Sequence, residues 1–164
     1  MAAGLPDQVD CERLADEKAN LQRVYELREL PRLQDLLADN QGNVHASFAF
    51  QRVAPGRAGA TVRVAAEPHL VCQRCLQGFP FAVAGKSEIE FADSEDATPV
   101  ESEREIYVVD RGRVSLRDLV EEELLLALPA IAACTAPETC GKAPALEEER
   151  SRPLAALRDL LKKT

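Results

Sequence analysis

The chain has 164 residues, a mass of 17.9 kDa and a formal net charge of -8, from 20 basic and 28 acidic side chains. This length is enough to bury one sizeable core, so we expect a single domain over residues 1–164 rather than two full domains. The negative balance excludes a global positive field that would attract nucleic-acid phosphates, so any contact with RNA should be local or mediated by a protein partner.

Residues 1–43 are predicted to form an N-terminal helical arm. Apolar residues recur in this segment at nearly helical spacing, and Pro31 interrupts the run. They are Leu14, Leu21, Val24 and Leu27 before the proline and Leu33, Leu36 and Leu37 after it. We therefore expect two short helices, or one helix followed by an irregular arm.

Residues 44–134 are predicted to form a β-rich core followed by an amphipathic helix. Apolar and polar residues alternate from Val44 to Phe50, which is the period of a half-buried strand. Extended character resumes at residues 61–66 and 70–72, and apolar residues between positions 79 and 91 indicate the return strands. The turn residues between these segments predict antiparallel pairing, with the Cys72-Gln73-Arg74-Cys75 loop at a tip between two strands.

The acidic segment 92–104 is predicted to be a solvated loop, and residues 106–109 form one further strand. Ser115 followed by Asp118 fits a helix N-cap, and an apolar stripe then continues to Pro129, which ends the helix. The stripe consists of Leu116, Leu119, Val120, Leu124, Ala127 and Leu128. The Glu121-Glu122-Glu123 run should form the solvent-exposed face of this helix.

Residues 135–164 are predicted to be a tail that ends in a short helix. Four leucines recur there at helical spacing, and two lysines follow them where a helix dipole favours positive charge. The leucines are Leu154, Leu157, Leu160 and Leu161. Taken together, the elements predict an α+β fold with an antiparallel β-sheet core and a C-x-x-C knuckle, flanked by N-terminal helices, one amphipathic helix and a short C-terminal helix.

Four of the five cysteines form two pairs. Cys72 and Cys75 stand at C-x-x-C spacing, and Cys134 and Cys140 form a wider pair near the end of the chain. Two thiolates at C-x-x-C spacing can take two corners of a tetrahedron around a zinc ion, and a distant pair can supply the other two. We therefore expect a structural zinc site made by these four residues, with no open position for catalysis. Cys11 is expected to be a spare thiol.

Two other interpretations of the thiols stay open. The cysteines can be reduced and without a ligand, since spacing alone does not establish coordination. A redox dithiol would place its first cysteine at the start of a helix, whereas Gly78, Phe79 and Pro80 favour a turn and a strand. His69 lies three residues before Cys72, an odd offset that sends the two side chains to opposite faces of a strand, so we expect an exposed histidine rather than a ligand.

No catalytic arrangement stands out in the sequence. We find no phosphate-binding Gly-rich loop, no Ser-His-Asp set and no paired-histidine metal motif, so an enzyme is not expected. Apolar runs are too short to span a bilayer, and the N-terminus lacks the pattern of a secretory signal. We expect a cytoplasmic protein with no membrane partner and no small-molecule substrate, in a compartment where metal binding is favoured over persistent disulfides.

The order of several motifs resembles the YceD family, the bacterial large ribosomal RNA subunit accumulation proteins. The motifs are Leu70-Val71-Cys72-Gln73-Arg74-Cys75-Leu76, Val114-Ser115-Leu116, Glu121-Glu122-Glu123-Leu124-Leu125-Leu126-Ala127-Leu128-Pro129 and the closing Arg152-Pro153-Leu154-Ala155-Ala156-Leu157. The acidic middle segment and Cys140 also match, so the resemblance runs through most of the chain. The C-x-R-C-L element carries little by itself, but its order with the acidic, leucine-rich helix is specific.

The resemblance implies a non-enzymatic role in the synthesis, processing or stability of 23S rRNA, and hence in large-subunit assembly. The partner would be a large-subunit rRNA precursor, or a basic ribosomal protein or assembly factor held by the acidic surface. Arg74 at the knuckle is a candidate for partner binding, although a local ion pair would explain it equally well. The competing hypothesis is a cytoplasmic redox sensor based on zinc or on a dithiol.

Overall fold

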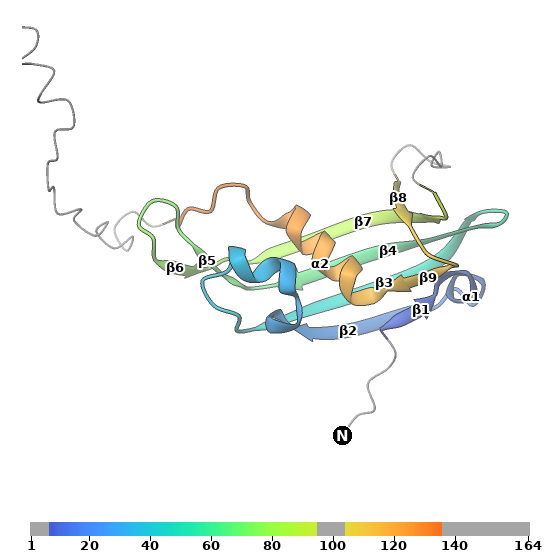
Figure 1. Cartoon of the computed structure of the whole chain (residues 1–164), viewed down its shortest axis with the longest axis horizontal. Helices are drawn as coiled ribbons and strands as arrows, with labels where there is room; N and C mark the ends of the chain where they lie inside the picture. The colour runs from blue at the N-terminus through green and yellow to red at the C-terminus, as the bar shows by residue number, and fades with distance from the viewer. Residues whose placement is uncertain (1–6, 95–103, 136–164) are drawn as a thin grey trace, which may run out of the picture.

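The computed structural model describes residues 7–94 and 104–135, and Figure 1 shows a long sheet with one helix lying across it. In chain order the elements are β1 (Gln8–Asp10), α1 (Cys11–Asp16), β2 (Asn20–Glu26), two 3₁₀ helices (Leu27–Glu29 and Pro31–Leu36), β3 (Asn43–Ala54), β4 (Arg57–Ala66), β5 (His69–Val71), β6 (Gly78–Pro80), β7 (Val83–Ala92), β8 (Glu105–Val108), β9 (Arg113–Ser115) and α2 (Leu116–Ala127). Cys140 and the predicted C-terminal helix lie outside the described residues, as does most of the predicted acidic loop.

The main sheet has five strands in the order β2-β3-β4-β7-β8, and two small ribbons pair β1 with β9 and β5 with β6. The first three pairs of the main sheet are antiparallel, which confirms the predicted antiparallel core. The last pair, β7 with β8, is parallel and was not predicted. A parallel neighbour needs a crossover connection, and the stretch between Ala92 and Glu105 has about the dozen residues that such a connection requires.

The core lies between one face of the sheet and α2. Alternate residues of β3 and β4 point to this inner face because side chains on a strand alternate with a period of two. They include Val44, Ala46, Phe48 and Phe50, and opposite them Ala60, Val62 and Val64. From α2, the buried apolar side chains are Leu116, Leu119, Val120 and Leu124. Burying each such large apolar side chain contributes roughly 1.5–3 kcal/mol, so this layer supplies most of the driving force for the fold.

Helix α2 begins and ends where the sequence predicts. The Ser115 hydroxyl accepts a hydrogen bond from the Asp118 amide at 3.2 Å, and it donates one to the Asp7 carboxylate at 2.8 Å. Asp7 also accepts from the Arg117 amide at 3.0 Å, so a residue far away in sequence holds the first turn. The helix ends at Ala127, and Leu128 is already extended, since the residue before a proline avoids the helical region.

The predicted N-terminal helical arm is only partly correct. A short helix, α1, and two 3₁₀ helices are present, but residues 20–26 form the edge strand β2 instead of a helix. Leu21 and Tyr25 are half-buried on the inner face, whereas Val24 is 58% exposed on the other face. The helical spacing of Leu21, Val24 and Leu27 is therefore a coincidence. Pairing with β3 determines that residues 20–26 form a strand.

The prediction that the acidic run of α2 faces solvent is wrong for two of its three residues. Glu121 is 3% exposed and Glu123 is 8% exposed. The Glu121 carboxylate accepts a hydrogen bond from the Arg32 amide at 2.5 Å, at the start of the second 3₁₀ helix. Glu123 accepts one from the Ser87 hydroxyl of β7. Both carboxylates are therefore buried with partners, which is the condition under which a buried polar group is tolerated.

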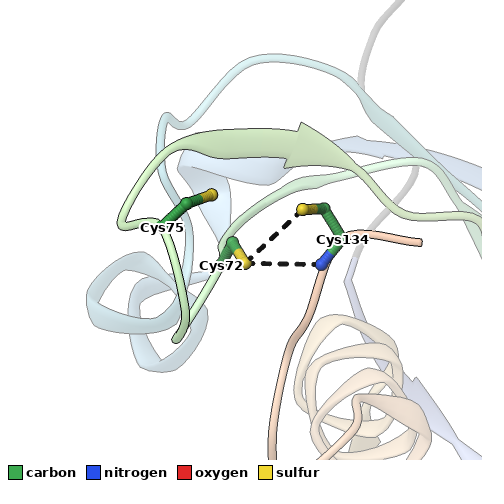
Figure 2. A group of neighbouring side chains, drawn as sticks. All are labelled: Cys72, Cys75 and Cys134. Atoms are coloured by element: carbon green, nitrogen blue, oxygen red, sulfur yellow. Dashed lines mark hydrogen bonds between the residues drawn. The ribbon is translucent and has the colours of Figure 1, made fainter. Parts of the chain in front are cut away.

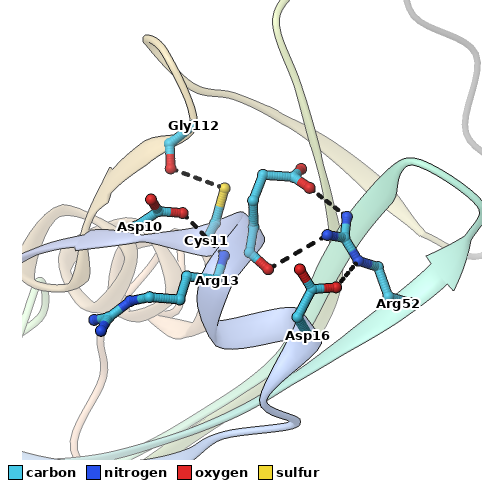
Figure 3. Close-up of polar contacts among 7 residues, drawn as sticks. Asp10, Cys11, Arg13, Asp16, Arg52 and Gly112 are labelled. Carbon is cyan, nitrogen blue, oxygen red and sulfur yellow. Dashed lines mark hydrogen bonds and ion pairs between the residues drawn. The ribbon is translucent and has the colours of Figure 1, made fainter.

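Helix α1 is held in place by contacts at both ends, as Figure 3 shows. The Cys11 thiol is fully buried and donates a hydrogen bond to the Gly112 carbonyl at 3.1 Å. On β3, the Arg52 guanidinium donates to Asp16 at 2.7 Å and to Glu12. Arg52 also lowers the pKa of Asp16, because the hydrogen bond stabilises the charged carboxylate. Cys11, expected to be a spare thiol, is thus part of the core.

Alkaline pH should destabilise the protein through Cys11. Burial, with the nearby charges of Glu12 and Asp10, raises the pKa of this thiol from its ordinary value of 9.0 to about 11. Between these two values the unfolded chain releases a proton that the folded chain retains, so the free energy of unfolding falls as pH rises, by about 2 kcal/mol. We expect the stability advantage of the wild type over Cys11→Ala, measured by thermal unfolding, to shrink between pH 8.5 and pH 10.5. A difference that does not change with pH would contradict this assignment.

Candidate metal centre

Three of the four predicted metal ligands lie together. Cys72 and Cys75 stand in the turn between β5 and β6, and Cys134 lies in the segment that follows α2. Their sulfur atoms all lie within 4.8 Å of one another, and the Sγ atoms of Cys72 and Cys134 are 3.7 Å apart. Figure 2 shows the three side chains converging from these two segments. The fourth predicted ligand, Cys140, lies outside the described residues.

The turn that presents the first two thiols is built by the local sequence. β5 and β6 pair antiparallel, with Val71 opposite Gly78 at the end of the ribbon. Beyond this pair the Cys72 amide donates to the Gln77 carbonyl at 2.9 Å, and the Leu76 amide donates to the Cys72 carbonyl at 2.8 Å. Leu76 adopts a positive φ of 60° to close the loop. The C-x-x-C pair therefore lies at the tip between two antiparallel strands, as predicted.

The segment after α2 is attached to this turn by main-chain contacts. The Gln73 amide donates to the Ala132 carbonyl at 2.8 Å, and the Cys134 amide donates to the Cys72 sulfur at 3.4 Å. The Arg74 guanidinium donates to the Cys134 carbonyl at 3.2 Å and approaches the Cys134 sulfur at 3.8 Å. Arg74 thus makes local contacts with the cysteine segment, and its role in partner binding stays a prediction.

The surroundings of Cys72 favour its thiolate form. Cys72 is buried, but its pKa is lowered from 9.0 to about 6, first because the Cys134 amide donates to the sulfur and second because the Cys75 amide does so. Burial acts in the opposite direction and is outweighed. Since the thiolate is the form that binds metals, the site holds a ligand atom largely ready for coordination at neutral pH.

The spacing of the sulfurs suits a zinc ion. With zinc–sulfur bonds of about 2.3 Å, the sulfurs at two corners of a tetrahedron are roughly 3.8 Å apart. The 3.7 Å separation of Cys72 and Cys134 agrees with this value. Three thiols within 4.8 Å supply three corners, which leaves one for a fourth donor. The donor set of three soft sulfur atoms fits zinc better than magnesium or calcium, which prefer oxygen.

The geometry does not resemble a thioredoxin-like redox site. There the first cysteine opens a helix, whereas Cys72 and Cys75 lie in a turn that leads into the strand β6. All four cysteines of the described residues are free thiols. His69 is exposed, as predicted, and its Nδ1 lies 2.7 Å from Oδ2 of Asp39. This contact lowers the pKa of Asp39.

Within the part of the chain that the structure describes, no helix is long and apolar enough to cross a membrane. No solved structure matches the chain. A family model does match: residues 60–161, more than half of the chain, match the model for the large ribosomal RNA subunit accumulation protein YceD. The matched range includes the C-x-x-C turn, helix α2 and both cysteines of the distal pair. The chain therefore belongs to the YceD family, whose name ties it to the accumulation of large-subunit ribosomal RNA.

Proposed function

We propose that this protein is a non-enzymatic factor that supports the synthesis, processing or stability of 23S rRNA, and through it the assembly of the large ribosomal subunit in the cytoplasm. The observation that carries the proposal is the family match over residues 60–161. The thiol cluster agrees with this role, because a metal site made of thiolates alone stabilises a fold but offers no catalytic base.

In this proposal the metal is a structural zinc ion held by Cys72, Cys75 and Cys134, with Cys140 as the fourth ligand. Cys72 and Cys75 lie between the two strands of the β5–β6 ribbon, and Cys134 follows α2, so the ion joins this ribbon to the segment after the helix. A closed shell of four sulfurs leaves no position for water or substrate. The contribution of the zinc is therefore to stability rather than to chemistry.

The partner in this proposal is the large-subunit rRNA precursor, or a basic ribosomal protein or assembly factor. The net charge of -8 suits the shielding of a basic protein until it is delivered to the rRNA. Arg74, at the tip that carries the cysteines, is the proposed contact on this side. The protein then acts as an adaptor that stabilises an early assembly intermediate.

Deletion of the gene tests the proposal. We expect a lower ratio of 23S to 16S rRNA and an accumulation of large-subunit precursors, measured by RNA electrophoresis and sucrose-gradient profiles. Expression of the wild-type chain from a plasmid should restore both. Unchanged 23S levels and unchanged precursor processing in the deletion strain would contradict the proposed function.

A further inference from the structure

The sheet has a second, open face that α2 does not cover. α2 packs against the inner face of β4 and β7, and the alternate residues of these strands point the other way. On this outer face the side chains are exposed, including His45 of β3, Arg63 of β4 and Ala84 of β7. Val24 of β2 is 58% exposed there. A sheet face that residues 7–94 and 104–135 leave open is available to a partner.

A trough of about 450 Å³ crosses this outer face, running over β2, β3, β4 and β7. Its floor is the main chain of a row of four residues, one from each strand, that stand opposite one another in the sheet: Arg23, Ala46, Val64 and Gly85. The side chains of this row belong to the inner face, so the floor presents backbone. One side of the trough is low because Ala65 and Ala84 are small, which permits close approach of an extended chain.

The other side of the trough is a row of hydrogen-bond donors. Gln22 stands opposite Ser47, Ser47 opposite Arg63, and Arg63 opposite Lys86, so these four residues form one line across four strands. The first three line the trough, and Lys86 continues the line on β7 beside it. Each carries at least one donor, and two carry a positive charge. Three steps of about 4.8 Å between strands make the line roughly 14 Å long, which spans several consecutive anionic groups of one ligand.

The charge of the trough is opposite to that of the whole chain. Among the described residues no carboxylate lines the trough, whereas two arginines, Arg23 and Arg63, do, although the chain has a net charge of -8. On this face Glu26 of β2 lies two residues beyond Val24 and is paired with Arg28 at 2.6 Å. Glu88 of β7 lies two residues beyond Lys86 on the same face. It is paired with Lys86 at 2.8 Å and with Arg104 at 3.6 Å, and these cations lower its pKa. The positive charge at the trough therefore exceeds the negative charge beside it.

We propose that this trough binds the sugar-phosphate backbone of single-stranded RNA, with Arg63 and Lys86 contacting phosphates and Gln22 and Ser47 contacting phosphate or ribose oxygens. The choice of RNA rests on the proposed function, and the choice of a polyanion rests on the donor row. No Phe, Tyr or Trp lines the trough, so it offers no platform for stacking several bases, and we expect recognition not to depend on sequence. RNA contact is thus local on a protein that is acidic elsewhere.

Fluorescence anisotropy with a labelled single-stranded RNA of about 20 nucleotides tests the proposal. We expect Arg63→Gln combined with Lys86→Gln to weaken binding at least about tenfold, and to reduce the slope of log Kd against log salt by about 1.4, which is 0.7 for each lost phosphate contact. The matched control is Arg13→Gln combined with Arg111→Gln, which removes the same charge from exposed positions outside the trough. This control should bind as the wild type does. Thermal unfolding verifies that both double variants are folded.

Two outcomes would overturn the trough proposal. One is an equal loss of affinity in the trough variant and in the control, which would mean that only total charge matters. The other is wild-type protein that does not bind this RNA at low salt, including the case in which it binds a basic ribosomal protein instead. In either case the proposed function stands if the deletion strain still loses 23S rRNA. A normal 23S level with trough-dependent RNA binding in vitro would contradict the function and support the trough.

Discussion

Replacing Cys72 with serine is expected to abolish stoichiometric zinc binding and to lower the Tm by about 10 °C. Cys72 lies within 4.8 Å of both other sulfurs and accepts the Cys134 amide, so its loss removes one ligand and the contact that positions another. A metal present at a thousand times its Kd stabilises the folded state by about 4 kcal/mol, and each kcal/mol shifts the Tm of a domain of this size by about 2–4 °C. Zinc per chain, measured by mass spectrometry on protein purified without added zinc, and thermal unfolding provide the two readouts.

The appropriate control is Cys11→Ala, since Cys11 bonds to Gly112 and is not part of the thiol cluster. That variant should lose some stability but retain its zinc. Cys140→Ser tests the fourth ligand in the same assay and should behave as Cys72→Ser does. Chelator should lower the Tm of the wild type and leave Cys72→Ser unchanged. A metal-free wild type with a readily reversible disulfide would instead favour the redox-sensor hypothesis.

Replacing Gly59 with alanine is expected to lower the free energy of unfolding by about 2–3 kcal/mol, at the upper end of what overpacking costs. A β-bulge between Arg52 and Ala54 places the Val53 side chain over Gly59. A Cβ on Gly59 would lie 2.7 Å from Val53 and 2.7 Å from the Ile89 carbonyl oxygen. The Val53 side chain can move, but the Ile89 carbonyl belongs to the interior strand β7 and cannot move without disturbing the β4–β7 ladder. Urea unfolding gives the measurement.

Gly56→Ala serves as the comparison, because a Cβ there has nothing within 4 Å and only the φ of 71° opposes the change. Its cost should be about 1 kcal/mol, which is typical of a non-glycine residue in the left-handed region. Adding Val53→Ala to Gly59→Ala should recover only the part of the loss that comes from the side-chain clash. Equal costs for the two glycine variants would show that crowding at Gly59 is not what matters.

The elements that the sequence predicts correctly are those in which one pattern acts alone. Strand β3 is identified by its alternation of apolar and polar residues. Helix α2 is identified by its N-cap, its apolar stripe and the proline that ends it. In each element burial of one face produces the pattern. The C-x-x-C turn is predicted for the same reason, since Gly78 and the apolar residues after it allow little except a return strand. The proximity of Cys134 to this turn is predicted because a tetrahedral zinc ion requires four ligands, and no local sequence pattern indicates it.

The features that the sequence does not predict depend on distant partners. The sequence predicts that Glu121 and Glu123 are exposed, because their hydrogen-bond donors, the Arg32 amide and the Ser87 hydroxyl, lie far away along the chain. Residues 20–26 have apolar spacing close to that of a helix, but they form strand β2 because they pair with the edge of β3. The donor row on the outer face exists only once the register of four strands is known, because Gln22, Ser47, Arg63 and Lys86 are separated by long stretches of chain.

The order of β3, β4 and α2 along the chain has a consequence for the newly made protein. The phenylalanines and valines of β3 and β4 are translated before the helix that covers them. Roughly 60 residues separate Ala66 from Leu124. At a translation rate of 5–20 residues per second, the apolar face of the β3–β4 hairpin is therefore complete about 3–12 s before helix α2 is made. During that interval the nascent chain exposes an apolar β-hairpin face near the ribosome, and a chaperone at the exit tunnel has time to bind it.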